Sequence, residues 1–324
     1  MTAAATPVTA SSRPPKAPWL VRARRGDRSG DRALRGATGL AVAIILAMLA
    51  VVLADVIRGG AGVLSWTFVS KAPEQGLTAG GIFPAIFGTA ALTLLMTVAA
   101  VPAGVATAIY LTEYASSRST VARIVRVCIA NLAGVPSIVF GLFGLGFFIS
   151  TVGRAIDAAS YGGRPTYGKP SLIWAALTLA ILTLPVVVVS TEEALRAVPR
   201  ELREASYALG ATKLQTILRV VLPEATGGIL TGAILAVGRG AGEVAPILFT
   251  GAAYFLPYLP THMNDQFMNL GYHVYVLATQ SPDVDKTKPQ LYGTVLVLLG
   301  LTLLLNMVAI VIRARMRRRA ASSH

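Results

Sequence analysis

The chain has 324 residues, of which 54% are hydrophobic and only 14% charged, and its formal net charge is +14. A soluble domain of this length would need a more polar surface, so the composition excludes one and predicts a polytopic membrane protein. The basic residues gather at the ends of apolar runs and at the termini, as topology signals do, which argues against nucleic-acid binding. The lone cysteine, Cys128, lies in an apolar run and excludes an internal disulfide.

Residues 1–36 are rich in Ala, Pro, Ser and Arg and show no apolar periodicity, so we expect a disordered, basic cytoplasmic tail. The first apolar run, about 37–57, follows this long polar stretch and is long enough to span a bilayer. We therefore interpret it as an anchor helix and not as a cleaved signal. We assign residues 37–313 to a transmembrane domain and residues 314–324 to a basic cytoplasmic C-terminal tail.

Further apolar runs predict five more spans, at about 82–112, 122–152, 171–191, 225–253 and 291–312. Several exceed the ~20 residues that a straight span needs, so tilted or kinked helices are expected. Prolines lie inside these runs, and within a bundle they often mark bent or broken helices; they are Pro102, Pro136, Pro185 and Pro246. The predicted fold class is an all-α membrane protein with six transmembrane helices.

Lysine and arginine counts predict the orientation of these spans. With the N-terminus inside, the inner segments hold 21, the outer loops hold seven and Arg239 lies within a span, which accounts for all 29. This asymmetry predicts that both termini are cytoplasmic. It also predicts that the charge-rich segment between the fourth and fifth spans, residues 192–223, faces the cytoplasm.

That segment has the pattern of a short amphipathic helix. Pro199 suits the first turn of a helix, and Gly210 stands where a left-handed cap is expected. Apolar residues recur at i, i+4, i+7 and i+11 and predict a stripe against the membrane surface: Val198, Leu202, Ala205 and Leu209. The opposite face, expected to point outward, holds Arg200, Arg203, Glu204 and Tyr207. Pro223 is expected to end the segment before the next span begins.

The same segment resembles a known family. Glu204-Ala205-Ser206, then Gly210, then Val220-x-Leu222-Pro223, is similar to the EAA–x3–G–x9–I–x–L–P signature of ABC importer permeases, with Ser206 and Val220 as mild departures. In that family this helix docks into a groove of the ATPase subunit and carries the nucleotide-driven motion. The resemblance therefore implies a cytoplasmic coupling helix that contacts the ATPase through Arg203, Glu204, Ala205, Ser206 and Gly210.

A charged pair lies inside the fifth predicted span, where Glu243 follows Arg239 by four residues and is expected on the same helix face. An intramembrane charge costs roughly 2.5–3.5 kcal/mol, so a functional role is the default hypothesis. The guanidinium fork suits two oxygens of an oxyanion, and hydrogen phosphate is a chemically sensible guest. A buried structural ion pair that fixes helix packing is the alternative. Glycines surround the pair and leave room for close helix approach.

The stretch 238–251, GRGAGEVAPILFTG, resembles the R-x2-GE-x-AP-L segment of phosphate ABC importer permeases, and residues 133–142 and 108–114 resemble further parts of that family. The closest likeness is to the PstA-type subunit. The resemblance implies a six-span type I importer permease in which Arg239 and Glu243 line the translocation path. It implies four partners besides phosphate: a second, PstC-type permease, two copies of a PstB-type cytoplasmic ATPase and a PstS-type extracytoplasmic phosphate-binding protein. The location implied is the bacterial plasma (inner) membrane.

Other functions share some of these features. The sister PstC-type subunit shares the charged span and the coupling helix, and an ABC permease for sulfate or molybdate would share them too. A self-powered secondary transporter would need ion sites in inverted repeats, and only one charged span is evident. A structural membrane protein without transport would have no evident use for Arg239 beside Glu243.

The sequence predicts no cofactor or metal site in this chain and no catalytic residue. Gly163–Lys169 reads G-x4-G-K like a P-loop, but Pro170 stands where a P-loop has Ser or Thr, and no strand precedes it. ATP and magnesium are therefore expected on the partner ATPase, and the chain is not expected to be an enzyme. His262 and His273 lack a third ligand and are interpreted as ordinary loop residues.

Overall fold

The computed structural model describes residues 28–322 except 75–76, 78, 117 and 282. The described residues contain six helices that are long and apolar enough to cross a membrane, which confirms the predicted number of spans. The chain divides into two compact units, Met1–Asp55 and Val56–His324.

Helix α2 (Arg28–Gly60) makes up the described part of the first unit and continues into the first residues of the second. Its apolar side chains are exposed along its length, as expected for a helix that faces lipid or another protein. The predicted N-terminal tail, residues 1–36, lies outside the described residues up to residue 27, and residues 28–36 are helical.

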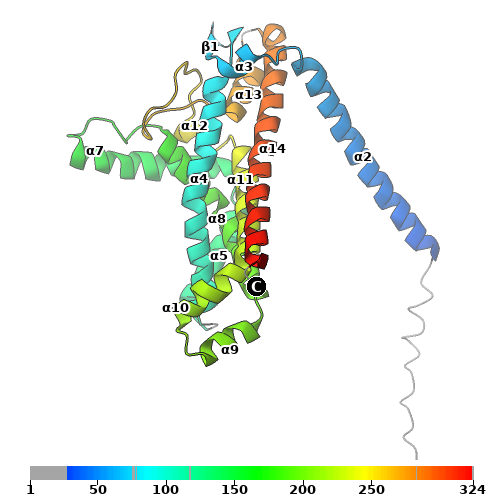
Figure 1. Ribbon diagram of the computed structural model, residues 1–324. Helices are drawn as coiled ribbons and strands as arrows, with labels where there is room; N and C mark the ends of the chain where they lie inside the picture. Colours follow the sequence, from blue (N-terminus) through cyan, green and yellow to red (C-terminus); the bar gives the residue numbers. More distant parts are fainter. Residues whose placement is uncertain (1–27, 75–76, 78, 117, 282, 323–324) are drawn as a thin grey trace, which may run out of the picture. The chain divides into compact units, whose positions relative to one another are not determined.

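Four long helices form the body of the second unit. They are α4 (Phe83–Ile109), α8 (Leu172–Ala197), α11 (Leu222–Ala241) and α14 (Val284–Ser322). Helix α8 packs against both α4 and α11, and α11 also packs against α14, so that the four run side by side in Figure 1. A short π-helix, η3 (Tyr110–Tyr114), extends α4 at the end of the bundle where α9 lies.

Short elements close the other end of this unit. They are α3 (Trp66–Ser70), the antiparallel pair β1 (Pro73–Glu74) and β2 (Ala79–Gly80), α12 (Ile247–Thr250) and α13 (Leu270–Thr279). The two strands pair with Pro73 opposite Gly80. Helix α13 packs against α14 and α4. Helices α3 and α13, the loop between the strands and the start of α4 share an apolar cluster that includes Phe68, Ile82 and Leu277.

The third predicted span, 122–152, is wrong at both ends. The chain forms α5 (Thr120–Gly134), breaks, and then continues as one helical run of α6 (Ser137–Phe143), π-helical η4 (Gly144–Gly153) and α7 (Arg154–Ser160). Pro136 causes the break, since it restricts Val135 to extended backbone and donates no hydrogen bond. The candidate span is therefore Ser137–Ser160, and α5 is a separate amphipathic helix beside α8.

Two apolar clusters hold the long helices together. One joins α4 and α8 through residues that include Leu92, Met96 and Leu179. The other lies toward η3 and includes Leu111, Leu195 and Val221. Helix α11 approaches its neighbours closely because it has glycine at the contact points: Gly228, Gly232 and Gly240 face Ala194, Ser190 and Met96, with no room for a Cβ.

The P-loop-like segment Gly163–Lys169 folds around a carboxylate of its own chain. Asp157 of α7 is buried, and its carboxylate accepts backbone hydrogen bonds from Thr166, Tyr167 and Gly168 at 3.0, 2.7 and 2.7 Å. A Cβ at Gly168 would lie 2.9 Å from Asp157 Oδ2, so glycine is needed for this close approach. Three N–H groups that a P-loop would offer to phosphate are thus already occupied.

We expect Asp157→Asn to loosen this loop. The amide offers only one acceptor oxygen and places an NH₂ against a backbone donor, so about 2 kcal/mol of stability should be lost. Thermal unfolding in detergent and protease cleavage within 161–169 measure the effect. Asp283→Asn serves as the control, because Asp283 forms an exposed pair with Lys286 that is worth less than about 1 kcal/mol. Equal losses in the two variants would contradict the role of the buried carboxylate.

Candidate functional site

The EAA-like motif lies on α9 (Arg200–Ala208), a short helix at one end of the bundle. Pro199 precedes it in extended conformation, and Leu209 is its C-terminal cap. Gly210 follows with φ of +81°, the left-handed conformation that the sequence predicts there. The Gly210 and Ala211 N–H groups donate to the Tyr207 and Ser206 carbonyls and complete the cap.

The predicted outward face of this helix is confirmed for Arg200, Glu204 and Tyr207, which are exposed, but not for Arg203. Leu202 is 39% exposed and Leu209 89% exposed, and Ala205 is exposed as well, so the apolar stripe does not pack on the chain. Only Val198, which precedes the helix, is buried. Arg203, expected on the outward face, instead points toward the bundle.

Arg203 is held by four acceptors. Its Nη2 lies 3.0 Å from Oε1 of Glu113 in η3 and 2.8 Å from the Leu195 carbonyl, and its Nη1 donates to the Val198 carbonyl at 2.7 Å. A longer bond reaches the Pro199 carbonyl. The side chains of Arg203 and Glu113 are only 16% and 9% exposed. A guanidinium with this many acceptors is stabilised on the inner side of α9, which explains why Arg203 does not point outward.

The turn after α9 is fixed by side chains. The Ser206 and Thr216 hydroxyls lie 2.9 Å apart, which ties α9 to α10 (Lys213–Thr216). Thr212 and Gln215 form a reciprocal capping box at the start of α10. The Lys213 ammonium lies 5.0 Å from the Tyr114 ring centroid, over its face. These contacts set the angle at which the chain leaves α9.

We expect Gly210→Val to disrupt this turn. A β-branched residue at φ +81° is strained, and the left-handed conformation alone costs L-residues roughly 1–2 kcal/mol. Amide hydrogen exchange across residues 200–216 should speed up in the valine variant. Gly210→Asn is the matched control, because asparagine visits this conformation more readily. Unchanged exchange with valine would mean that the cap does not hold α9 in place.

The chain then enters one long helical run. Helix α10 continues through the π-helical η5 (Ile217–Val221) into α11 without a break, so the candidate span is Lys213–Ala241. Pro223 was predicted to end a segment but lies in the first turn of α11, where its missing N–H is tolerated. At 1.5 Å per residue, this run places Arg239 roughly 40 Å from the start of α10.

Arg239 and Glu243 lie at the far end of that run. The predicted span, 225–253, is too long, because α11 ends at Ala241 and the chain turns before α12. The pair is therefore not on one continuous helix, yet Arg239 Nε still lies 3.7 Å from Glu243 Oε1. Gly240 contacts Met96 and Thr183, which lie near the middles of the spans Phe83–Tyr114 and Leu172–Ala197. The charged pair is thus at mid-depth of the bundle.

The pair is partly open and loosely held. The Arg239 and Glu243 side chains are 42% and 22% exposed, and Glu243 is the one charged partner of Arg239 among the described residues. The contact is too long for a good hydrogen bond, so most of the guanidinium fork remains available to an incoming acceptor. Chemically, this arrangement can offer a planar set of donors to an oxyanion.

The structure adds charged residues that the sequence reasoning did not select. Glu113 lies in the family-like segment 108–114, but no sequence pattern connects it to Arg203, which lies 90 residues on. Glu192 in α8 lies 2.7 Å from Arg196 Nη2 and 3.6 Å from Arg126 Nε in α5. Arg126 also donates to the Leu111 carbonyl at 2.7 Å. Two sequence features could have indicated these charged residues. One is a carboxylate at the end of an apolar run, and the other is an arginine that follows another such run.

Six spans, a polar helix where the chain reverses and a charged pair at mid-depth define a membrane transport permease. A solved structure of a bacterial alginate ABC transporter, in complex with its alginate pentasaccharide-bound periplasmic protein, contains a chain similar in fold. The TM-score is 0.62 at 16% identity, over 94% of this chain and 98% of that one. At that identity the likeness is one of fold, and it confirms the predicted type I ABC importer permease bundle.

Residues 100–322 match the model of a family described as "Binding-protein-dependent transport system inner membrane component", and the chain belongs to that family. It is 44% identical over 176 residues to "Phosphate transport system permease protein PstA 1" of Mycobacterium tuberculosis, covering 54% of this chain and 52% of that protein. It is 33% identical over 265 residues to "Phosphate transport system permease protein PstA" of Yersinia pestis, covering 82% and 83%. The chain is thus a multi-pass inner-membrane permease subunit and not an enzyme, and its family works with an ATPase and a substrate-binding protein.

Proposed function

We propose that this chain is the PstA-type permease subunit of an ATP-driven phosphate importer and forms half of its translocation path. The observation that carries this proposal is the single helical run from Lys213 to Ala241, which begins next to α9 and has Arg239 in its last turn. Relatives of the same family, named as phosphate transport permeases, support phosphate as the substrate.

In this proposal Arg239 and Glu243 line the path. Hydrogen phosphate carries about −1.5 charges and presents several oxygens to the half-exposed guanidinium. Glu243 holds Arg239 weakly while phosphate is absent, which lowers the cost of a charge at mid-depth. A contact of this kind binds weakly enough to release its ligand, as transport requires.

The coupling helix of this proposal is α9, with Arg203, Glu204, Ala205, Ser206 and Gly210 as its functional residues. Two PstB-type ATPase subunits would close around ATP and move α9, and the long helical run would carry the displacement to Arg239 by alternating access. A PstC-type permease would complete the bundle, and a PstS-type binding protein would deliver phosphate from outside. Both termini and α9 lie on the cytoplasmic side in this assembly, as the lysine and arginine asymmetry predicts.

Radiolabelled phosphate uptake in cells that lack this permease tests the proposal. Expression of the wild-type chain should restore uptake, and excess sulfate or molybdate should not compete. Competition by either would indicate another oxyanion. If the chain restored uptake only in cells that lack the PstC-type subunit, the chain would itself be the PstC-type subunit. Phosphate movement by the purified chain alone on an ion gradient would overturn the importer reading.

Glu204 on α9 is the residue whose change should most directly weaken binding of the ATPase. Glu204 is exposed on α9 and has no charged partner among the described residues, so Glu204→Lys reverses a charge that is free to meet another subunit. Co-purification of the ATPase should fall about tenfold or more, while membrane insertion is unchanged. The control Glu193→Lys changes an exposed glutamate of α8 outside this helix. Equal co-purification of the ATPase with both variants would refute the contact.

A further inference from the structure

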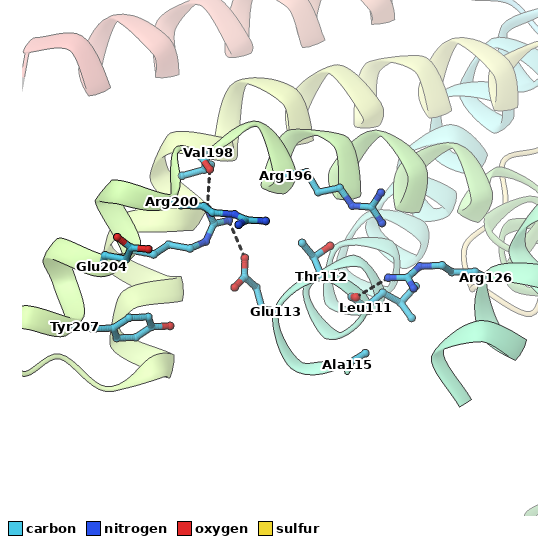
Figure 2. Close-up of a pocket in the computed structure, with 11 residues that line it drawn as sticks. Leu111, Thr112, Glu113, Ala115, Arg126, Arg196, Val198, Arg200, Glu204 and Tyr207 are labelled. Atoms are coloured by element: carbon cyan, nitrogen blue, oxygen red, sulfur yellow. Dashed lines mark hydrogen bonds and ion pairs between the residues drawn. The ribbon is translucent and has the colours of Figure 1, made fainter. Parts of the chain in front are cut away.

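A cavity of about 770 Å³ lies beside α9 and is separate from the charged pair in the span. Four elements wall it: η3, α5, the end of α8 with the residues just after it, and α9. Figure 2 shows Arg126 and Arg196 on one side, Glu204 and Tyr207 on the other, and Thr112 and Glu113 between them. Its volume is in the usual range for small-molecule sites.

The charge of this cavity is predominantly positive. Four arginines line it, Arg126, Arg196, Arg200 and Arg203, against two glutamates, Glu113 and Glu204. Arg203 is occupied by Glu113 and carbonyl groups, and Glu192 is shared between Arg126 and Arg196. Arg200 has no hydrogen bond or ion pair to any described residue. The cavity thus offers the Arg200 guanidinium, which no described residue neutralises, beside two arginines that share one carboxylate.

Two polar atoms in the cavity wall are buried without a hydrogen-bond partner among the described residues. They are the Thr112 hydroxyl and Nε of Arg126. Leaving a buried donor unpaired costs about 1–3 kcal/mol, more for a charged group. Arg126 Nε has only the ion pair with Glu192 at 3.6 Å, and either group could gain a hydrogen bond from a ligand in the cavity once its side chain turns toward it. Both atoms belong to residues that line the same cavity and come from different elements, η3 and α5.

We propose that this cavity binds a phosphate group from the cytoplasm and that the bound anion restrains α9. The inference rests on the proposed function, which places α9 on the cytoplasmic side. An anion here would accept from Arg126 and Arg196, which belong to α5 and α8, and from Arg200 on α9. It would therefore tie the coupling helix to two helices of the bundle, and phosphate that accumulates inside the cell would slow its own import.

The glutamates of the wall favour a protonated oxyanion. Glu113 and Glu204 accept hydrogen bonds but cannot donate them, so they repel an anion that carries no proton. Phosphate keeps a hydroxyl near neutral pH and can donate to such a carboxylate, whereas sulfate has no proton to donate. The cavity should thus prefer phosphate to sulfate.

Hydrogen–deuterium exchange on the full chain in lipid nanodiscs tests the inference. All variants carry Arg239→Gln, which removes the intramembrane cation. Excess phosphate should slow exchange in residues 110–115 and 196–208, and sulfate at equal ionic strength should not. Arg126→Gln and Arg196→Gln should each raise the phosphate concentration at half-protection about tenfold. Arg123→Gln, on the same helix as Arg126 but outside the cavity, is the control.

Each outcome decides the matter. If ATP protects these residues from exchange and free phosphate does not, the cavity still binds a phosphate group, and that group belongs to a nucleotide. Absence of protection by either anion overturns it, and loss of ATPase co-purification in the Arg126 and Arg196 variants would then assign the cavity to a protein contact. Protection that both arginine variants retain, with unchanged exchange in 172–195 as evidence of folding, also overturns it. If wild type fails to restore uptake while protection persists, the proposed function fails and the site stands.

Discussion

Arg239→Gln is expected to reduce phosphate uptake by about a hundredfold or more at matched membrane levels. The substitution removes the charge and the fork of donors at mid-depth, and truncating one partner of a charge pair that bound phosphate would bury costs roughly 2–5 kcal/mol. Arg239→Lys should retain part of the activity, because it keeps the charge but not the planar geometry. Arg219→Gln, an exposed arginine in the same helical run, is the control and should import normally.

The same variants separate transport from packing. If the pair only fixed helix packing, Arg239→Gln would lower the unfolding temperature and leave the uptake of the surviving protein unchanged. Glu243→Gln gives a second test, because it leaves Arg239 charged but without its partner. Under the proposed function it should shift the concentration dependence of uptake more than the amount of folded protein. Normal uptake by both variants would return the pair to a structural role.

Glu113→Gln is expected to separate ATP hydrolysis from transport. Arg203 on α9 would lose the one carboxylate that ties it to η3, and breaking a largely buried ion pair costs about 3 kcal/mol. The coupling helix would then move without displacing the bundle. In reconstituted transporter, ATP hydrolysis should persist while phosphate imported per ATP falls severalfold or more.

A double-mutant cycle tests whether this effect belongs to the pair. Arg203→Gln alone should resemble Glu113→Gln, and the double variant should lose much less than the sum, because the two residues share one interaction. Arg123→Gln is the control, since this exposed arginine of α5 lies outside the cavity and its loss should cost less than about 1 kcal/mol. Additive losses would mean that Glu113 and Arg203 act independently.

Much of this architecture can be read from the sequence. Continuous apolar runs predict six spans, because a segment that crosses lipid must satisfy its backbone hydrogen bonds within its own helix. That requirement depends only on the local sequence. The left-handed conformation of Gly210 can be predicted for a similar reason, since the tolerance of a positive φ is a property of glycine itself. The mid-depth position of Arg239 follows from its place within an apolar run.

Tertiary contacts decided the rest. Helical periodicity predicts an apolar stripe on α9 but not the neighbour that it faces, and the pull of Glu113, distant in sequence, turns Arg203 inward and leaves Leu209 exposed. Two prolines, one inside a predicted span and one expected to end a segment, had opposite effects. Pro136 ends a helix, whereas Pro223 is absorbed where π-helical η5 meets α11. A proline breaks a helix when the surrounding backbone cannot satisfy the carbonyl groups that it leaves without a hydrogen bond. Only the packed structure determines whether those carbonyl groups find a partner.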